Sequence, residues 1–253
     1  MRRWRLELVG AAALVCVALM LGYAATRPKP ACVRQDFEGA PFTVCAFDAS
    51  GQDLRLALAG AGGQRLRTFR ALADALGAER PRVDFAMNAG MFNESGAPIG
   101  LFIANGDEIH PISTATGGGN FGLQPNGVFS ADADGTLHID TTSAYLARAP
   151  HPAWATQSGP MLVIGGQLHP SIQQEGPSRH VRNGVGITDP RRAYFVISDQ
   201  PVSFGRFARF FRDELKCTDA LYFDGSVSSL WAPRLHRRDE HAKLGPMVVV
   251  LGR

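Results

Sequence analysis

The fold is decided by a stretch that reads Val185-Gly186-Ile187-Thr188-Asp189-Pro190-Arg191-Arg192-Ala193-Tyr194-Phe195-Val196-Ile197-Ser198. Two short apolar segments, residues 185–188 and 193–198, flank the dipeptide Asp189-Pro190, which favours a turn. The pattern therefore predicts two neighbouring strands joined by a short connection.

The same pattern recurs towards the N-terminus. Residues 101–104 form an apolar run that ends in Asn105-Gly106, a strong short-range signal for a hairpin. Residues 161–164, Gly165-Gly166 and residues 167–168 repeat the arrangement. Further strands are predicted over residues 42–47, 54–59, 83–87 and 247–251.

Two segments, residues 68–76 and 204–215, predict helices. In the second, apolar residues recur at helical spacing on one face, namely Phe204, Phe207, Ala208, Phe211 and Leu215. We interpret this stripe as core rather than as an aromatic binding site. Strands joined by hairpins, with few helices, indicate the α+β class: a hairpin-rich mixed sheet with a few covering helices. Without a repeat or a second linker, residues 32–253 are expected to form a single domain.

The N-terminus has the pattern of an export segment. Met1-Arg2-Arg3-Trp4-Arg5 precedes an uncharged run from residue 8 to residue 26 that is rich in Leu, Val and Ala. Basic residues before an apolar run are typical of a secretory signal or a signal anchor, and spanning a bilayer takes roughly 20 such residues. We expect residues 1–26 to be a signal peptide or a membrane anchor, and residues 27–31 to be a spacer. The rest is then extracytoplasmic, either periplasmic or secreted.

Composition and charge give no support for a nucleic-acid partner. Apolar residues make up 45% and charged residues 19% of the chain, which is ordinary for a globular protein. The formal net charge is +3, but Arg2, Arg3, Arg5 and Glu7 contribute +2 of it and leave +1 for the remainder. The basic character therefore belongs to the N-terminal segment.

Three cysteines lie beyond the apolar run: Cys32, Cys45 and Cys217. An oxidising compartment favours one disulfide among them, and the sequence leaves all three pairings open. No Cys-x-x-Cys occurs, so neither a zinc knuckle nor a redox motif is indicated.

Two glycine-containing stretches lack the context of well-known sites. Residues 117–122 have the spacing of a dinucleotide fingerprint, but no apolar strand precedes them and Pro125 opposes a following helix. They are expected to form a glycine loop that can approach a ligand. Gln157-Ser158-Gly159 lacks the first glycine of a nucleophile elbow, so it does not indicate a serine hydrolase.

Four junctions, one of which contains Gln157-Ser158-Gly159, place polar residues beside glycines at the end or start of an apolar strand. They are Asn88-Ala89-Gly90-Met91-Phe92, Gln157-Ser158-Gly159-Pro160, Arg182-Asn183-Gly184-Val185-Gly186 and Asp224-Gly225-Ser226. Taken singly, Asp224-Gly225 is a turn, Arg182 is a surface cation and Asn88 is a strand cap. The recurrence of such junctions favours a shared site, because strand ends present side chains and glycine admits a ligand close to the backbone.

Together these motifs resemble the phosphodiester glycosidase family, which contains the lysosomal uncovering enzyme that removes N-acetylglucosamine from a sugar–phosphate–sugar diester. The likeness runs from about Phe85 to the C-terminus and is closest to the bacterial branch of the family. Ala89 and Ser226 stand where the uncovering enzyme has a second glycine, and the cysteine-rich appendages of the animal enzyme are absent. The resemblance therefore implies the site and the reaction class, but not the substrate.

The resemblance implies a role for each group of candidate residues. Arg182 would hold phosphate oxygens through its planar fork, aided by backbone N–H groups of Gly90, Gly159 and Gly184. Asp224 would act as acid or base, with Glu94 as a weaker second carboxylate. Asn88, together with Ser228 and Ser229, would orient hydroxyl groups or water. The remaining candidates for substrate contacts are Asn183, Ser158, Gly225 and Ser226.

The resulting hypothesis is an exported hydrolase that acts on a sugar-1-phosphodiester or a related phosphorylated envelope glycan. Its partner would be a carbohydrate or sugar phosphate, and it would also contact the membrane if the N-terminal segment is retained. No cofactor is required by the sequence; a divalent metal held by Asp224 is compatible with it, but no ligand set demands one. The alternative is a non-catalytic envelope module that binds a glycan.

Overall fold

The computed structural model describes residues 31–252, which form one α+β domain. The expected signal or anchor at residues 1–26, and the spacer up to residue 30, lie outside the described residues. Within the described part, no helix is both long and apolar enough to cross a membrane.

Seventeen strands and a few short helices make up the domain. The strands are β1 (Cys32–Phe37), β2 (Ala40–Asp48), β3 (Gln52–Ala57), β4 (Val83–Asn88), β5 (Phe102–Ala104), β6 (Asp107–His110), β7 (Gly127–Ala131), β8 (Leu137–Thr141), β9 (Trp154–Ser158), β10 (Met161–Ile164), β11 (Gln167–Leu168), β12 (Asn183–Asp189), β13 (Arg192–Ser198), β14 (Asp219–Tyr222), β15 (Leu230–Ala232), β16 (Arg237–Arg238) and β17 (Met247–Gly252). The α-helices are α2 (Phe69–Leu76), α3 (Gly119–Gly122), α4 (Thr142–Arg148) and α5 (Phe204–Arg209). The 3-10 helices are η1 (Gly77–Arg82), η3 (Gly225–Val227) and η4 (Pro233–Leu235), and η2 (Phe210–Glu214) is a π-helical turn that continues α5.

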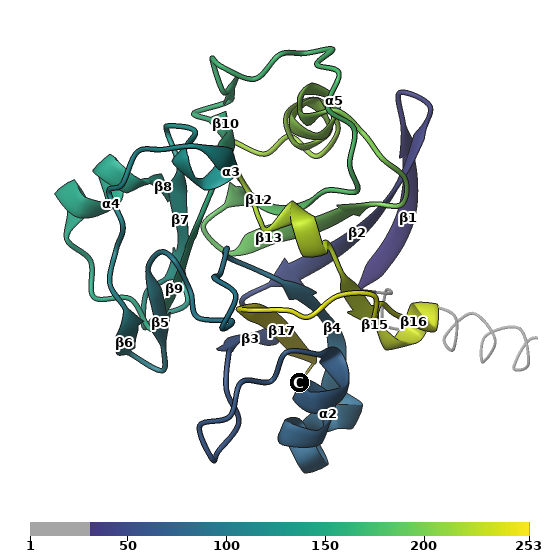
Figure 1. Cartoon of the computed structure of the whole chain (residues 1–253). Coiled ribbons are helices and arrows are strands. Elements are labelled where there is room, and N and C mark those ends of the chain that lie inside the picture. Colours follow the sequence, from purple (N-terminus) through teal and green to yellow (C-terminus); the bar gives the residue numbers. More distant parts are fainter. Residues whose placement is uncertain (1–30, 253) are drawn as a thin grey trace, which may run out of the picture. The chain divides into compact units, whose positions relative to one another are not determined.

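The strands form three sheets (Figure 1). The largest has the order β1-β2-β13-β12-β14-β10-β11, the second β16-β15-β4-β17-β3, and the third β6-β5-β9-β7-β8. The α+β class is confirmed, but the strands do not form the one mixed sheet that was expected. Every strand pair described is antiparallel. In pairs such as β12 and β13, a short connection returns the chain directly beside itself, whereas pairs such as β4 and β17 join strands far apart in sequence.

A central core joins the three sheets. Side chains alternate along each strand, so one face of every sheet contributes to it. In β13, Phe195 points into this core and Val196 points to the opposite face of its sheet. In β17, Val248 points into the core and Val249 points to the opposite face. The outer faces are buried as well, which explains why β17 is apolar at consecutive positions.

One helix covers the outer face of each sheet, and Figure 1 shows α5, α2 and α4 on three different sides of the domain. The predicted Phe-rich stripe of α5 and η2 packs on the largest sheet, as expected of core residues. Gly186 lets this helix approach: a Cβ there would lie 2.6 Å from the Phe211 ring and 2.7 Å from the Cys217 sulfur. The predicted helix over residues 68–76 is α2, with Thr68 as its N-cap.

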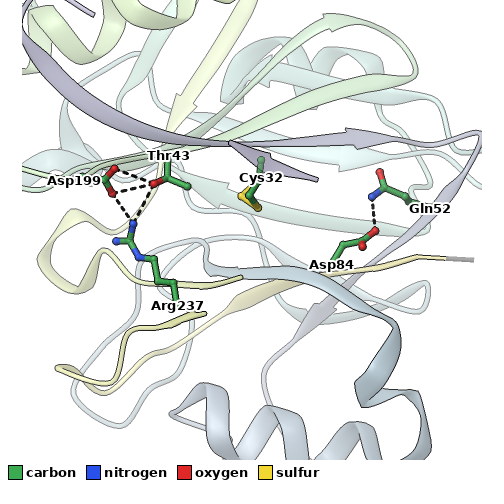
Figure 2. The surroundings of a disulfide bond; sticks show 7 residues. Cys32, Thr43, Gln52, Asp84, Asp199 and Arg237 are labelled. Atoms are coloured by element: carbon green, nitrogen blue, oxygen red, sulfur yellow. Dashed lines mark hydrogen bonds and ion pairs between the residues drawn. A yellow bond between two sulfur atoms is a disulfide. The ribbon is translucent and has the colours of Figure 1, made fainter. Parts of the chain in front are cut away.

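A disulfide between Cys32 and Cys45 joins β1 to β2, where the two residues lie directly opposite each other. Cys217 is free and buried, and burial raises the pKa of its thiol to about 12. Figure 2 shows the disulfide with two polar contacts: Arg237 to Asp199, which links the second sheet to the end of β13 in the largest sheet, and Gln52 to Asp84, which lies within the second sheet. The disulfide therefore fastens the first described strand to the domain.

Candidate functional site

Three of the glycine-framed junctions meet where β4, β12 and β14 end. The N–H of Phe223 donates to the carbonyl of Asn183 (3.0 Å), and the N–H of Asp224 donates to the carbonyl of Ala89 (3.1 Å). The side-chain amide of Asn88 donates to the carbonyl of Asp224 (2.8 Å). Segments more than 90 residues apart in sequence are thus joined at one end of the sheets.

The buried polar residues on the inner side of this junction form what we call the amide cluster: Asn88, Asn183, Ser228 and Ser229. Asn88 Oδ1 accepts hydrogen bonds from Asn183 Nδ2 (3.0 Å) and from the N–H of Ser229 (2.8 Å). Asn183 Oδ1 accepts one from the Ser228 hydroxyl (2.9 Å). Both amide oxygens are therefore occupied by protein groups, as in a scaffold that fixes the strand ends.

The outer side of the junction carries a second group, the arginine cluster: Arg182, Tyr222 and Asp224, with Phe204 of α5. Gly184 lies opposite Tyr222 in the β12–β14 ladder, so these two face the same way. Arg182 lies two residues before Gly184 and Asp224 lies two residues after Tyr222, so both share that face of the sheet. The side chains of the two clusters thus lie on opposite sides of the largest sheet.

Arg182 is buried, with 1% of its surface exposed, and no carboxylate neutralises it among the described residues. Nε donates to the carbonyl of Val202 (2.9 Å), Nη1 to the Tyr222 hydroxyl (3.2 Å), and Nη2 to the carbonyl (3.1 Å) and hydroxyl (3.3 Å) of Ser178. Its guanidinium carbon lies 3.6 Å from the centre of the Phe204 ring. Burial lowers the pKa of Arg182, yet with only neutral groups around it the side chain is an uncompensated cation.

Asp224 is also largely buried, with 9% of its surface exposed. Oδ1 accepts hydrogen bonds from the N–H (3.1 Å) and the hydroxyl (2.6 Å) of Ser226, so that Asp224 is the N-cap of η3. Oδ2 has no hydrogen-bond donor among the described residues. Burial raises the pKa of Asp224, and the Ser226 hydrogen bonds oppose that shift. A carboxyl group with one free oxygen and a raised pKa is suited to proton transfer.

Tyr222 lies beside Arg182 and the Asp224-Gly225 turn, and it was not among the residues predicted for the site. Its hydroxyl accepts from Arg182, and a Cβ on Gly225 would lie 1.6 Å from that hydroxyl oxygen. Burial raises the pKa of Tyr222, and the nearby charge of Asp224 raises it further. The only signal in the sequence was a tyrosine within an apolar strand directly before Asp-Gly. Gly225 therefore makes room for a side chain of the site.

The other predicted residues are more dispersed. Glu94 is exposed in a turn, where no hydrogen bond joins it to either cluster within the described residues. Gly90 packs against β9, since a Cβ there would lie 2.6 Å from the Thr156 hydroxyl oxygen. Gly184 lies inside the ladder between β12 and β14, and a Cβ there would lie 2.5 Å from the Leu221 carbonyl oxygen.

Ser158 and Gly159 lie at the end of β9. Neither the Ser158 hydroxyl nor that of Thr156 has a hydrogen-bond partner, although both are buried. Gly159 contacts the glycine loop, because a Cβ there would lie 3.3 Å from the carbonyl oxygens of Asn120 and Phe121. No group of three or more His, Cys, Asp or Glu residues suited to a metal ion occurs in the described residues.

The chain is similar to known proteins in sequence and in fold. The family model for phosphodiester glycosidase matches residues 81–250. A curated relative, the uncharacterized protein YigE of Escherichia coli strain K12, is 34% identical over 193 residues, which are 75% of this chain and 74% of the relative.

Among solved structures, the catalytic domain of zebrafish N-acetylglucosamine-1-phosphodiester alpha-N-acetylglucosaminidase, auto-inhibited by its pro-peptide, aligns with a TM-score of 0.61 at 14% identity over 88% of this chain and 81% of that one. A hypothetical protein from Synechocystis aligns with a TM-score of 0.57 at 14% identity over 88% of this chain and 61% of that one. At this level of identity both show a shared fold. Taken with the family match, they place the chain in the phosphodiester glycosidase family.

Proposed function

We propose that this protein is an exported hydrolase that cleaves a sugar-1-phosphodiester or a related phosphorylated envelope glycan. One observation carries the proposal: among the described residues, a buried cation without a carboxylate partner and a carboxyl group with a free oxygen share one face of the sheet, with Tyr222 beside both. A phosphodiester linked to a sugar offers an anion for the first group and a bond to cleave for the second.

The residues support a displacement that uses one carboxylate. Asp224 takes a proton from water, the water oxygen bonds to the anomeric carbon, and the bond from that carbon to the phosphate oxygen breaks. The leaving group is a phosphate monoester, which is stable as an anion and needs no proton to depart. Arg182 stabilises that developing negative charge. This explains how the site can work although Glu94 lies in an exposed turn.

Export is part of the proposal. The Cys32–Cys45 disulfide supports it, because disulfides persist in oxidising compartments such as the periplasm. In this view residues 1–26 direct export or anchor the chain to the membrane, residues 27–31 form the spacer, and residues 32–253 form the enzymatic domain.

The test is Asp224→Asn, assayed on a labelled sugar-1-phosphodiester. General acid–base catalysis supplies roughly 10²–10⁴-fold in rate, so we expect a loss of that size with unchanged substrate affinity. Asp107→Asn, the same change at an exposed position of β6, is the matched control. Turnover at the wild-type rate in Asp224→Asn would remove Asp224 from catalysis. A wild-type protein that binds the diester without cleaving it would instead indicate the glycan-binding alternative.

A further inference from the structure

Residues 173–179 form an exposed segment next to the arginine cluster, which we call the strap. Its residues are exposed, apart from Gly176, which is half-buried. Both of its ends are fixed: Ile172 is buried, and His180 exchanges two backbone hydrogen bonds with Val202 (3.2 and 2.9 Å). The strap is therefore a short link between two fixed points.

Ser178 of the strap covers the fork of Arg182. A guanidinium has five N–H donors, and four of those of Arg182 are in use. Two of the four, both on Nη2, donate to the carbonyl and hydroxyl oxygens of Ser178. The other two donate to Val202 and Tyr222, the second of which lies in β14. Within the described chain, the two oxygens of Ser178 are therefore the only acceptors of Arg182 that can move away without disrupting a sheet or the backbone hydrogen bonds between His180 and Val202.

We infer that the strap is a closed gate, and that the two oxygens of Ser178 occupy the place that oxyanion oxygens of the substrate take when it opens. The inference rests on the proposed role of Arg182 in binding phosphate. A charged oxygen is a much stronger acceptor for a guanidinium than the neutral oxygens of Ser178. An incoming phosphate also supplies the countercharge that the buried Arg182 lacks.

The contacts that hold the strap are few and lie at the surface. Arg209 of α5 donates to the Gln174 carbonyl (3.0 Å) and pairs with the exposed Glu175 (2.8 Å). Gly205 lets the strap backbone lie against α5, since a Cβ there would lie 2.1 Å from the Gln174 carbonyl oxygen. Glu175 is largely exposed and Arg209 also pairs with Glu38, so the Glu175 ion pair contributes little to stability and the closed state can be displaced by a ligand.

The first test is hydrogen–deuterium exchange with inorganic phosphate as the probe. We expect phosphate to increase exchange at residues 173–179 while it protects the ends of β12 and β14. Ligands usually protect the segments they touch, so faster exchange in the strap is the diagnostic result. Phosphate that binds and leaves the strap unchanged, or protects it, would overturn the inference.

The second test weakens the strap without touching Arg182. Glu175→Ala removes the ion pair to Arg209, and we expect it to lower the Kd for phosphate by up to about fivefold, the equivalent of one exposed ion pair. Glu108→Ala, an equal change of charge on β6, is the matched control and should leave the Kd unchanged. A Kd in Glu175→Ala equal to that of the wild type would also overturn the gate.

A third variant separates the gate from the proposed function. Arg182→Gln should abolish both phosphate binding and the exchange response. If it binds phosphate like the wild type, Arg182 is not the anion site and the proposed role fails together with the gate. If phosphate binds through Arg182 while the strap stays closed, only the gate fails. The wild-type and Glu175→Ala measurements stand even if Arg182→Gln does not fold.

Discussion

The amide cluster and the arginine cluster lie at the same strand ends and differ in how completely the protein satisfies their polar groups. Asn88 and Asn183 bond to each other and to Ser228 and Ser229, so their oxygens have protein donors. In the arginine cluster, Asp224 keeps a free oxygen and Arg182 has no countercharge. Hydrogen bonds that close on themselves build a scaffold, whereas groups left open are available to a ligand. Similar glycine-framed motifs thus contribute to a structural scaffold in one cluster and to a candidate ligand site in the other.

The largest expected difference between the clusters concerns stability. Asn183→Ala removes the donor to Asn88 and the acceptor of the Ser228 hydroxyl, both inside the protein. Three hydrogen bonds are lost, since the Asn183 amide also donates to the Asn88 carbonyl. At about 1 kcal/mol each, we expect a loss of about 3 kcal/mol in the free energy of unfolding, measured by urea denaturation. Asn88→Ala combined with Asn183→Ala should cost less than the sum of the single changes.

Asp224→Asn provides the contrast, because it should not destabilise the protein. Burial raises the folded-state pKa of Asp224 above its unfolded value. Stability is therefore lost as the pH rises from the ordinary Asp range through the raised folded pKa, and the variant escapes that loss. Above this window we expect Asp224→Asn to unfold at the same or a higher urea concentration than the wild type. A variant as unstable as Asn183→Ala would place Asp224 in the scaffold and contradict the division into two clusters.

Tyr222→Phe should have an intermediate effect on function. The variant keeps the ring in the apolar layer beside α5 but leaves Nη1 of Arg182 without its acceptor. We expect kcat/KM on the sugar phosphodiester to fall about tenfold, the equivalent of one lost hydrogen bond to a charged group. Tyr194→Phe, on the same face of β13, which β12 separates from β14, is the matched control. Equal activity of the two variants would mean that Tyr222 only fills space.

Local chemistry made most of the fold predictable. The hairpin of β12 and β13, the strand β17 and both predicted helices follow from residue periodicity and turn residues within short windows. The division into three sheets depends on pairings such as β4 with β17, which join residues far apart in sequence and leave no local signal. The helix α4 was missed because seven residues are too few to show a clear period.

The sequence predicted which residues lie at the candidate site better than it predicted the role of each residue. Residue type identified Asn88, Arg182 and Asp224, but burial decides what each side chain does, and burial depends on the assembled fold. Phe204 illustrates the limit: it belongs to the apolar stripe of α5 and also stacks on Arg182. Asn88, taken from sequence as a group that orients substrate, has its carbonyl-type oxygen fully engaged by Asn183 and Ser229.

The smallest expected effect concerns the pH dependence of turnover and tests whether Asp224 acts as a base. The Ser226 hydroxyl stabilises the ionised carboxylate and so lowers the pKa that burial raises. Ser226→Ala removes that hydrogen bond, and the pKa of Asp224 should rise further. If Asp224 must be ionised to accept a proton from water, the acid limb of the kcat profile moves to higher pH while the rate on the plateau changes little. The control is Ser50→Ala, which removes a hydroxyl that donates to the carboxylate of Asp48, outside both clusters, and should leave the limb in place. A limb that stays or moves to lower pH in Ser226→Ala would show that another group titrates.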